Sequence, residues 1–171
     1  GQAFVVGNTV SLAADTAFPT VATEKSLIFS GPVTITGASR TLTSAVGTTV
    51  AGRTVQFDGA IGDGGNNLGV TKAGLGNVTL AGTNTYTGTT KLNSGTMQLN
   101  KTGAANAIPG SLDIGDGVGT AIDTLNPFLS NQIADSATVN VFSTGAWALG
   151  AVTFTNSETI TNLNIVSTGI A

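Results

Sequence analysis

The chain has 171 residues, of which 40% are hydrophobic and 9% charged, and its net charge is −3. So little charge argues against solvated helices, and six basic residues scattered singly form no stripe that could neutralise the phosphates of a nucleic acid. The absence of Cys and His excludes disulfides, thiol chemistry and His-dependent hydrolysis, and no apolar run reaches the roughly 18 to 20 residues of a membrane-spanning helix.

The N-terminal segment, residues 1–25, contains two short apolar stretches that are typical of strands, Phe4–Val6 and Val10–Leu12. We expect this segment to pack either on the rest of its own chain or, by strand addition, on a neighbouring molecule. The sequence leaves both alternatives open.

Residues 26–171 repeat one pattern, in which two apolar residues flank a polar one and a Gly, Asn or Asp follows. The alternation turns every second side chain inward, and the residue that follows allows a tight corner. Separations of about twenty residues fit a unit that stacks on itself. We therefore predict an all-β, single-domain parallel β-helix (β-solenoid) without helices, in which each pair is the same strand of a successive coil. The pairs are Val33–Ile35, Val55–Phe57, Val78–Leu80, Met97–Leu99, Leu112–Ile114, Val152–Phe154 and Leu163–Ile165.

The loop Gly62–Asn67 offers the oxygen atoms and the flexible backbone of a calcium loop. It lacks the Asp at every second position and the closing Glu of the calcium-binding pattern. It also lacks the Lys-Ser or Lys-Thr that follows a phosphate-binding glycine loop. We therefore predict no metal site and no cofactor.

The next segment, Gly69–Asn100, contains the most specific pattern in the chain. Its residues resemble the passenger-associated, or autotransporter-associated, β-strand repeat of bacterial surface proteins, whose usual pattern is close to LTKxGxGTLTLSGxNTYTGxTTVNxGTL. This resemblance implies a secreted or surface-displayed right-handed β-helix, usually part of a much longer array. The stretches that match are Val70–Gly76, Val78–Gly82, Asn84–Gly88 and Gly95–Thr96.

Two carboxylates, Asp113 and Asp116, are the candidates for acid/base chemistry. Asp113 lies between two apolar residues, so we expect its side chain to face outward. Asp116 lies beside Gly in a corner, where short polar side chains bond their own backbone. We therefore predict surface and turn roles for these two residues and no enzyme activity, and a β-helix polysaccharide-degrading enzyme is only the third hypothesis.

Two further patterns could serve binding. Tyr86 and Trp147 could stack on sugar rings, but Tyr86 belongs to the repeat and Trp147 lies between alanines, so packing is favoured for both. Thr-x-Thr pairs, such as Thr83 and Thr85, could order water for ice binding. Their spacing is irregular, and outward Thr is common in strands of low-charge proteins.

Both ends of the expected solenoid are strand-like and apolar, with no capping helix. A head-to-tail contact between such ends does not close on itself, so it produces a filament. Our leading hypothesis is a mature exported protein of the extracellular space or bacterial surface, a structural β-solenoid that forms a homo-polymer as a surface fibre or matrix. The alternative is a non-catalytic adhesin passenger fragment that binds glycans or host surfaces. The residues predicted for self-association are Phe4, Val5, Val6, Val10, Leu12, Leu163, Ile165 and Val166.

Overall fold

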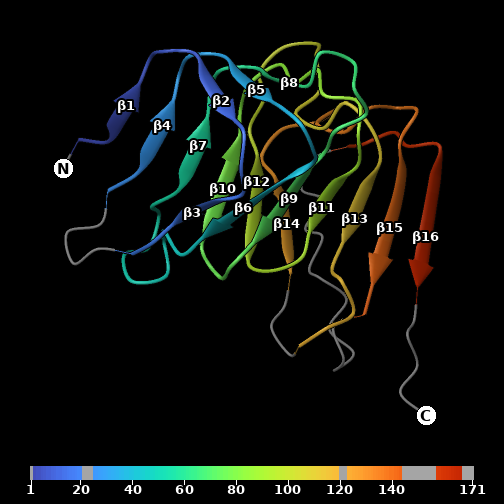
Figure 1. Cartoon of the computed structure of the whole chain (residues 1–171). Helices are drawn as coiled ribbons and strands as arrows, with labels where there is room; N and C mark the ends of the chain where they lie inside the picture. The colour runs from blue at the N-terminus through green and yellow to red at the C-terminus, as the bar shows by residue number, and fades with distance from the viewer. Residues whose placement is uncertain (1, 21–24, 120–122, 144–156, 167–171) are drawn as a thin grey trace.

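The chain forms a β-solenoid. The computed structural model describes residues 2–20, 25–119, 123–143 and 157–166 (Figure 1). Every regular element in these ranges is a strand, and every strand pairing is parallel. Successive coils lie side by side from β1 at one end to β16 at the other (Figure 1). The predicted all-β parallel β-helix is confirmed.

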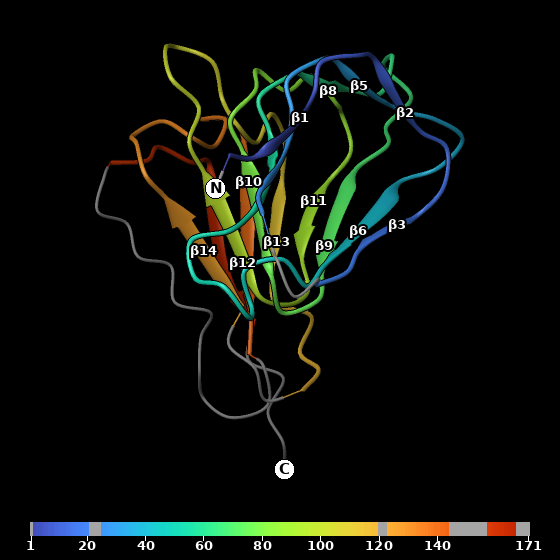
Figure 2. The same ribbon diagram turned by 90° about the vertical axis from the view of Figure 1, so that its left-hand side faces the viewer.

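The solenoid has three faces, which are seen from the β1 end in Figure 2. Sheet A contains β1 (Phe4–Val6), β4 (Leu27–Phe29), β7 (Val55–Phe57), β10 (Asn77–Leu80), β12 (Thr96–Leu99) and β14 (Thr124–Pro127). Sheet B contains β2 (Val10–Leu12), β5 (Val33–Ile35) and β8 (Ile61–Gly62). Sheet C contains β3 (Thr16–Phe18), β6 (Arg40–Ser44), β9 (Val70–Ala73), β11 (Thr90–Leu92), β13 (Leu112–Ile114), β15 (Thr138–Phe142) and β16 (Asn162–Val166).

The N-terminal segment forms the first coil and packs on its own chain. Its strand β1 pairs with β4, β2 pairs with β5, and β3 pairs with β6. Each of the three lies at the edge of its sheet. The first coil therefore has one side covered by the second coil, and the other side is an outer edge.

The repeated apolar pairs do not all occupy the same face, so the prediction that each pair is the same strand of a successive coil was wrong. All three faces bury alternate residues, and the same local pattern therefore arises on each of them. The pairs Val55–Phe57, Val78–Leu80 and Met97–Leu99 do stack on one another in sheet A. Val33–Ile35 lies in sheet B, Leu112–Ile114 and Leu163–Ile165 lie in sheet C, and Val152–Phe154 lies outside the described residues.

The coils differ in length because the corners hold loops of different size. Val78 pairs with Met97, 19 residues later, whereas Leu42 pairs with Lys72, 30 residues later. The predicted period of about twenty residues therefore holds around the Gly69–Asn100 segment and is exceeded elsewhere. The pairing of the strands stays parallel through these changes, so the loops are accommodated outside the sheets.

One hydrophobic core runs along the inside of the solenoid. The inward side chains of sheet A stack from coil to coil, and the rings of Phe29 and Phe57 lie 4.9 Å apart between centroids at an interplanar angle of 10°. At the corner that follows sheet A, glycines stack in the same way. A Cβ atom on Gly59 would lie 1.9 Å from the carbonyl oxygen of Gly31, and one on Gly82 would lie 2.3 Å from that of Gly59. Only a residue without a side chain fits at Gly59 and at Gly82.

Candidate functional site

The lysine of the repeat segment lies inside the solenoid. Lys72 alternates with Val70 on β9, and the Lys72 side chain is 0% exposed. Its Nζ donates hydrogen bonds to the carbonyl oxygens of Ala73 (3.1 Å), Gly74 (2.5 Å) and Ser94 (2.7 Å). Because Ser94 belongs to the following coil, the ammonium group joins two coils at the corner after sheet C. Sequence reasoning counted Lys72 among the scattered basic residues, although its alternation with Val70 indicates an inward side chain.

A buried carboxylate lies at the same corner. Asp123 precedes β14, and burial, together with the nearby Asp116, raises its pKa to about 6. The Lys72 charge and a backbone hydrogen bond from Gly95 act in the opposite direction. Burial in turn lowers the pKa of Lys72 to about 8, against the effect of Asp123. Oδ2 of Asp123 has no hydrogen-bond partner within the described ranges. The corner thus holds one cation and one carboxylate, each stabilised by the other's charge.

The loop Gly62–Asn67 is organised around a second buried carboxylate, that of Asp63. Oδ1 of Asp63 accepts a hydrogen bond from the Gly65 N–H at 2.9 Å, and Oδ2 accepts from the Leu68 N–H at 2.9 Å and from Thr87 Oγ1 at 2.7 Å. Burial alone would raise the pKa of Asp63, but these hydrogen bonds hold it well below its usual range. The carboxylate therefore closes a turn and ties it to the next coil through Thr87.

After the third coil, the face that carries sheet B has only isolated backbone pairing within the described ranges, such as the bridge between Ile108 and Ile133, and side chains add further links between coils. In the fourth coil, Asn84 Oδ1 accepts a hydrogen bond from the Ile61 N–H (2.8 Å), and Asn84 Nδ2 donates to the carbonyl of Ala107 (2.7 Å). One amide group therefore joins the coils on either side of its own. Tyr86 is buried nearby, with its Oη 2.6 Å from Thr90 Oγ1. The packing role predicted for Tyr86 is confirmed, whereas Trp147 lies outside the described residues.

In the last coils, too, side chains form hydrogen bonds to the backbone of neighbouring coils. The side chain of Gln132 donates to the carbonyl of Lys101 (2.9 Å) and accepts from the Lys101 N–H (2.6 Å). The carboxylate of Glu158 accepts hydrogen bonds from the Gln132 and Ile133 N–H groups at 2.7 and 3.1 Å. Sequence reasoning missed these bridging residues because amides and carboxylates in loops have no periodic signal.

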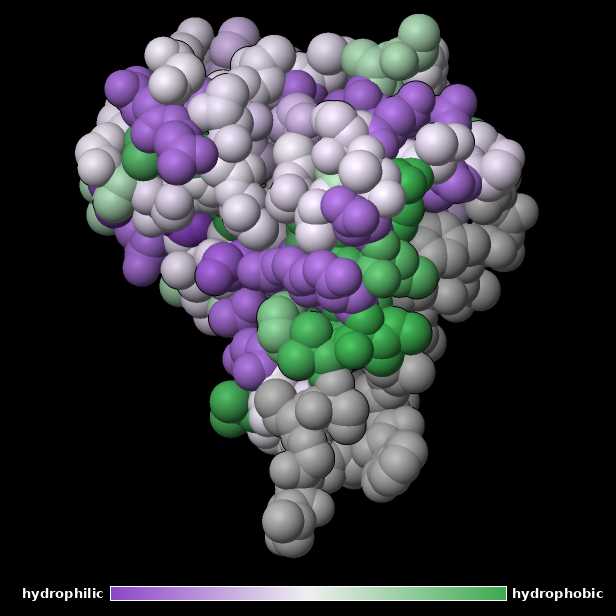
Figure 3. All heavy atoms as spheres, turned by 90° about the vertical axis from the view of Figure 1, so that its right-hand side faces the viewer, coloured by the Kyte–Doolittle hydropathy of each residue, from purple (hydrophilic) through white to green (hydrophobic). Residues whose placement is uncertain are grey.

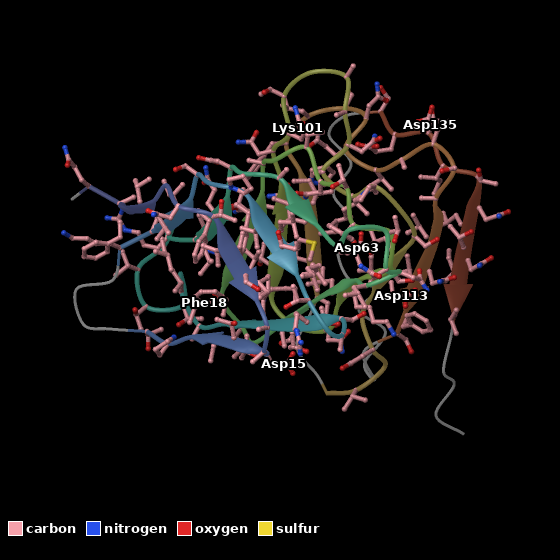
Figure 4. The ribbon with its side chains drawn as sticks, turned by 45° about the horizontal axis from the view of Figure 1, so that its top comes forward. Asp15, Phe18, Asp63, Lys101, Asp113 and Asp135 are labelled. Carbon is pink, nitrogen blue, oxygen red and sulfur yellow. The ribbon has the colours of Figure 1, made fainter. Side chains whose placement is uncertain are left out.

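The two candidate catalytic carboxylates have separate neighbours. Asp113, labelled in Figure 4, lies on the outward face of β13, where its Oδ1 accepts from Asn140 Nδ2 at 2.7 Å and its Oδ2 lies 3.8 Å from Lys91 Nζ. Asp116 accepts a hydrogen bond from the Val118 N–H at 2.9 Å. The outward position of Asp113 and the turn role of Asp116 are both confirmed. The structure gives each of them a structural partner and does not bring them together as an acid/base pair.

The end strands carry the residues predicted for self-association. Phe4 (63% exposed) continues the inward column of Leu27, and Ile165 (64% exposed) continues that of Val141. Figure 3 shows apolar surface on the side that carries β16. Lys25 Nζ lies 5.1 Å from the centroid of the Phe4 ring. Of the eight residues, Phe4, Val5, Leu163 and Ile165 are exposed, Val6, Val10 and Val166 are half-buried, and Leu12 is buried.

Two further kinds of feature, a metal-binding cluster and a membrane-spanning helix, are absent from the described ranges. No group of three or more His, Cys, Asp or Glu side chains in these ranges is arranged to hold a metal ion. No helix in the same ranges has the length and apolarity to cross a membrane. Several buried polar side chains, among them Lys72, Asn84 and Gln132, bond to the backbone of neighbouring coils, which supports a role in stacking.

Comparison with known proteins assigns the central segment. The family model of the passenger-associated-transport-repeat matches residues 70–99. Searches of curated proteins and of solved structures gave no match. The matched residues include the buried Lys72 and the bridging Asn84, and they confirm the resemblance found in the sequence. Residues 70–99, from β9 to the end of β12, therefore match the passenger-associated-transport-repeat and lie within a longer β-solenoid.

Proposed function

We propose that this chain is a structural, non-catalytic β-solenoid of the passenger type, exported to the cell surface or the extracellular space, whose molecules stack end to end into a fibre or matrix. The observation that carries the proposal is the pair of outer edges. The strands β1, β2 and β3 are edge strands at one end, and β16 is an edge strand at the other. Apolar side chains that continue the core are exposed at both edges.

The passenger-type role is supported by the repeat and by the use of the buried polar groups. The family of the matched repeat is a structural one associated with exported passengers. Lys72, Asp63 and Asn84 all bond to neighbouring coils. Side chains whose polar groups are hydrogen-bonded between coils stabilise the stack, and these groups are not available to bind a substrate.

The geometry of the edges supports stacking. Strands in a parallel solenoid all run in the same direction, so the first coil of a second copy can add to the last coil of the first without a change of strand sense. The contact joins two different surfaces, and repetition of such a contact gives an open filament and not a closed dimer. Exchange of the first coil onto a neighbouring molecule would form the same interface that this coil makes with the second coil.

The proposal is tested with variants that block one end each. Phe4→Asp places a carboxylate in the first edge, and Ile165→Asp places one in the last. Both side chains are mostly exposed, so the fold should survive both changes. We expect the unmodified chain to form fibres with rising concentration in sedimentation velocity and negative-stain electron microscopy, and each variant alone to remain monomeric.

A mixture of the two variants is the decisive sample. Each variant keeps one intact end, so the mixture should form pairs and stop there. Val118→Asp is the matched control, because Val118 is an exposed apolar residue in a corner and not at an end, and this variant should form fibres normally. Monomers of the unmodified chain at every concentration, or long fibres from the mixture, would contradict end-to-end stacking.

A further inference from the structure

A column of outward side chains runs along the whole of sheet C. The strand registers align one residue from each coil, and the register of β3 with β6 places the residue before β3 in the same line. The side chains in this column are polar at every position, in contrast to the mainly apolar columns inside. Its members are Asp15, Thr41, Thr71, Lys91, Asp113, Asn140 and Asn164.

Near both ends, neighbouring members of the column bond to one another. At the first end, Asp15 Oδ1 accepts a hydrogen bond from the Thr41 N–H at 2.9 Å. Toward the last end, Asn140 Nδ2 donates to Asp113 Oδ1 at 2.7 Å, and Asn164 Nδ2 donates to Asn140 Oδ1 at 2.9 Å. Asp15 and Asp113 are labelled in Figure 4. The column therefore helps to hold one coil in register with the next.

The two ends of the column complement each other. Asp15 is exposed, its Oδ2 has no hydrogen-bond partner within the described ranges, and a carboxylate can only accept. Asn164 is exposed on the edge strand β16 and uses one of its two amide N–H donors toward Asn140. One end of the column therefore offers an acceptor and the other a donor.

We propose that Asn164 of one molecule donates a hydrogen bond to Asp15 of a second copy, and that this pair fixes the register of the stacked ends. The inference rests on the proposed function and adds the residues that face each other across the contact. Continuation of the column places Asp15 of the second copy beside Asn164 and Thr16 of that copy over Ile165. The occupant of the edge is a second copy because the same chain supplies the donor, the acceptor and strands of matching direction.

Alternation along the strands limits the other registers. A shift by one residue would turn every outward side chain inward, so only shifts by two are compatible with both faces. A shift of two in one direction would place Asp15 beside Asn162 instead. Asn162 and Asn164 are therefore a matched pair of test positions on one strand, with the same side chain and the same outward direction.

The experiment measures end-to-end association by sedimentation velocity for three variants. Asn164→Asp puts a second carboxylate opposite Asp15, and we expect it to weaken association by about threefold to fivefold. Asp15→Asn combined with Asn164→Asp exchanges donor and acceptor, and should restore association to within about twofold of the unmodified chain. Asn162→Asp adds the same charge beside Ala13 in the proposed register and should leave association unchanged. Thermal unfolding of each variant checks that the fold persists.

The outcomes separate the two proposals. Monomers of the unmodified chain at every concentration would overturn the stacking itself. If the unmodified chain assembles but Asn164→Asp behaves like Asn162→Asp, or the double variant stays as weak as Asn164→Asp, the Asn164 and Asp15 pair is wrong while stacking stands. If only Asn162→Asp weakens association, the proposed register is wrong and the register shifted by two residues, with Asp15 beside Asn162, takes its place.

Discussion

At the scale of single residues, the interior polar groups show how the repeat holds its coils. Burial of a polar group is unfavourable unless hydrogen bonds replace those to water. Lys72, Asp63 and Asn84 meet this condition through partners that include groups in a neighbouring coil. Their hydrogen bonds therefore connect coils that the apolar core alone would allow to slide.

Replacement of Lys72 by Met tests this role. Lys72→Met keeps most of the side-chain volume but removes the donor to three carbonyl oxygens and the charge that stabilises Asp123. We expect a loss of about 3 kcal/mol in the free energy of unfolding, measured by urea denaturation, because one partner of a buried charged set is removed. Lys91→Met is the control, since Lys91 is 51% exposed, and should change stability by less than about 1 kcal/mol. Equal effects would contradict a structural role for Lys72.

The buried Asp123 predicts a pH dependence with a definite sign. Its pKa is raised from 3.8 to about 6, so the folded chain binds this proton more tightly than the unfolded chain. The stability from this group is complete below pH about 3.8 and is lost as the pH rises through about 6. In the same window Lys72 stays charged and Asp63 stays ionised, because their pKa values lie above and below it.

The Asp123→Asn variant isolates that effect. We expect the unmodified chain to gain stability relative to Asp123→Asn as the pH falls from 7 to 4, measured by thermal unfolding at several pH values. Asp113→Asn is the comparison for an outward carboxylate that is paired at the surface. If the difference in stability between the unmodified chain and Asp123→Asn stays constant from pH 4 to 7, the pKa of Asp123 is not raised by folding and the prediction is wrong.

At the scale of elements, the fold depends both on short strands with alternating burial and on tight corners between them. Alternation of apolar and polar residues was sufficient to predict strands at Val55–Phe57, Val78–Leu80 and Met97–Leu99. It could not assign a face, because the same alternation serves sheets A, B and C. At some corners the sequence restricts the residue type more strongly than in the strands. Stacked glycines such as Gly31 and Gly59 bring the backbones of successive coils into direct contact, which excludes a side chain there.

Gly59→Ala is the test of corner stacking. The added Cβ would lie 1.9 Å from the carbonyl oxygen of Gly31, which belongs to backbone and cannot move aside freely. We expect a loss of about 1 to 3 kcal/mol in unfolding free energy from this overpacking. Gly7 lies in the corner of the first coil, one position before the residue equivalent to Gly59; for Gly7→Ala the nearest atom is Ser30 Oγ at 3.7 Å, so stability should be almost unchanged. Indistinguishable melting curves for the two variants would refute the stacked corner.

The candidate site was only partly predictable from sequence, for physical reasons. The outward Asp113, the turn role of Asp116 and the buried Tyr86 follow from local alternation and turn chemistry. Lys72 was missed because a lysine is rarely buried, and only its place in the alternation reveals it. Bridging by Asn84 depends on coils that are far apart in the sequence, so no local pattern carries it.

At the scale of the whole molecule, each coil is stabilised mainly by the coils on either side. Among the described residues, the coils of β1 and β16 each have one such neighbour, and apolar side chains on these two strands are exposed. A second copy supplies the missing neighbour at each end. The same interactions that stack coils within the chain, the apolar columns inside and the polar column outside, would then continue through the fibre.

The most direct test of this account is electron microscopy of the purified chain over a concentration series. Within the described ranges sheet C has seven strands, and parallel coils are spaced at about 4.8 Å, so stacked molecules should give fibres one solenoid wide with an axial repeat of about 34 Å. That repeat is the predicted result. Single particles at every concentration, or fibres that grow in width without it, would contradict end-to-end stacking.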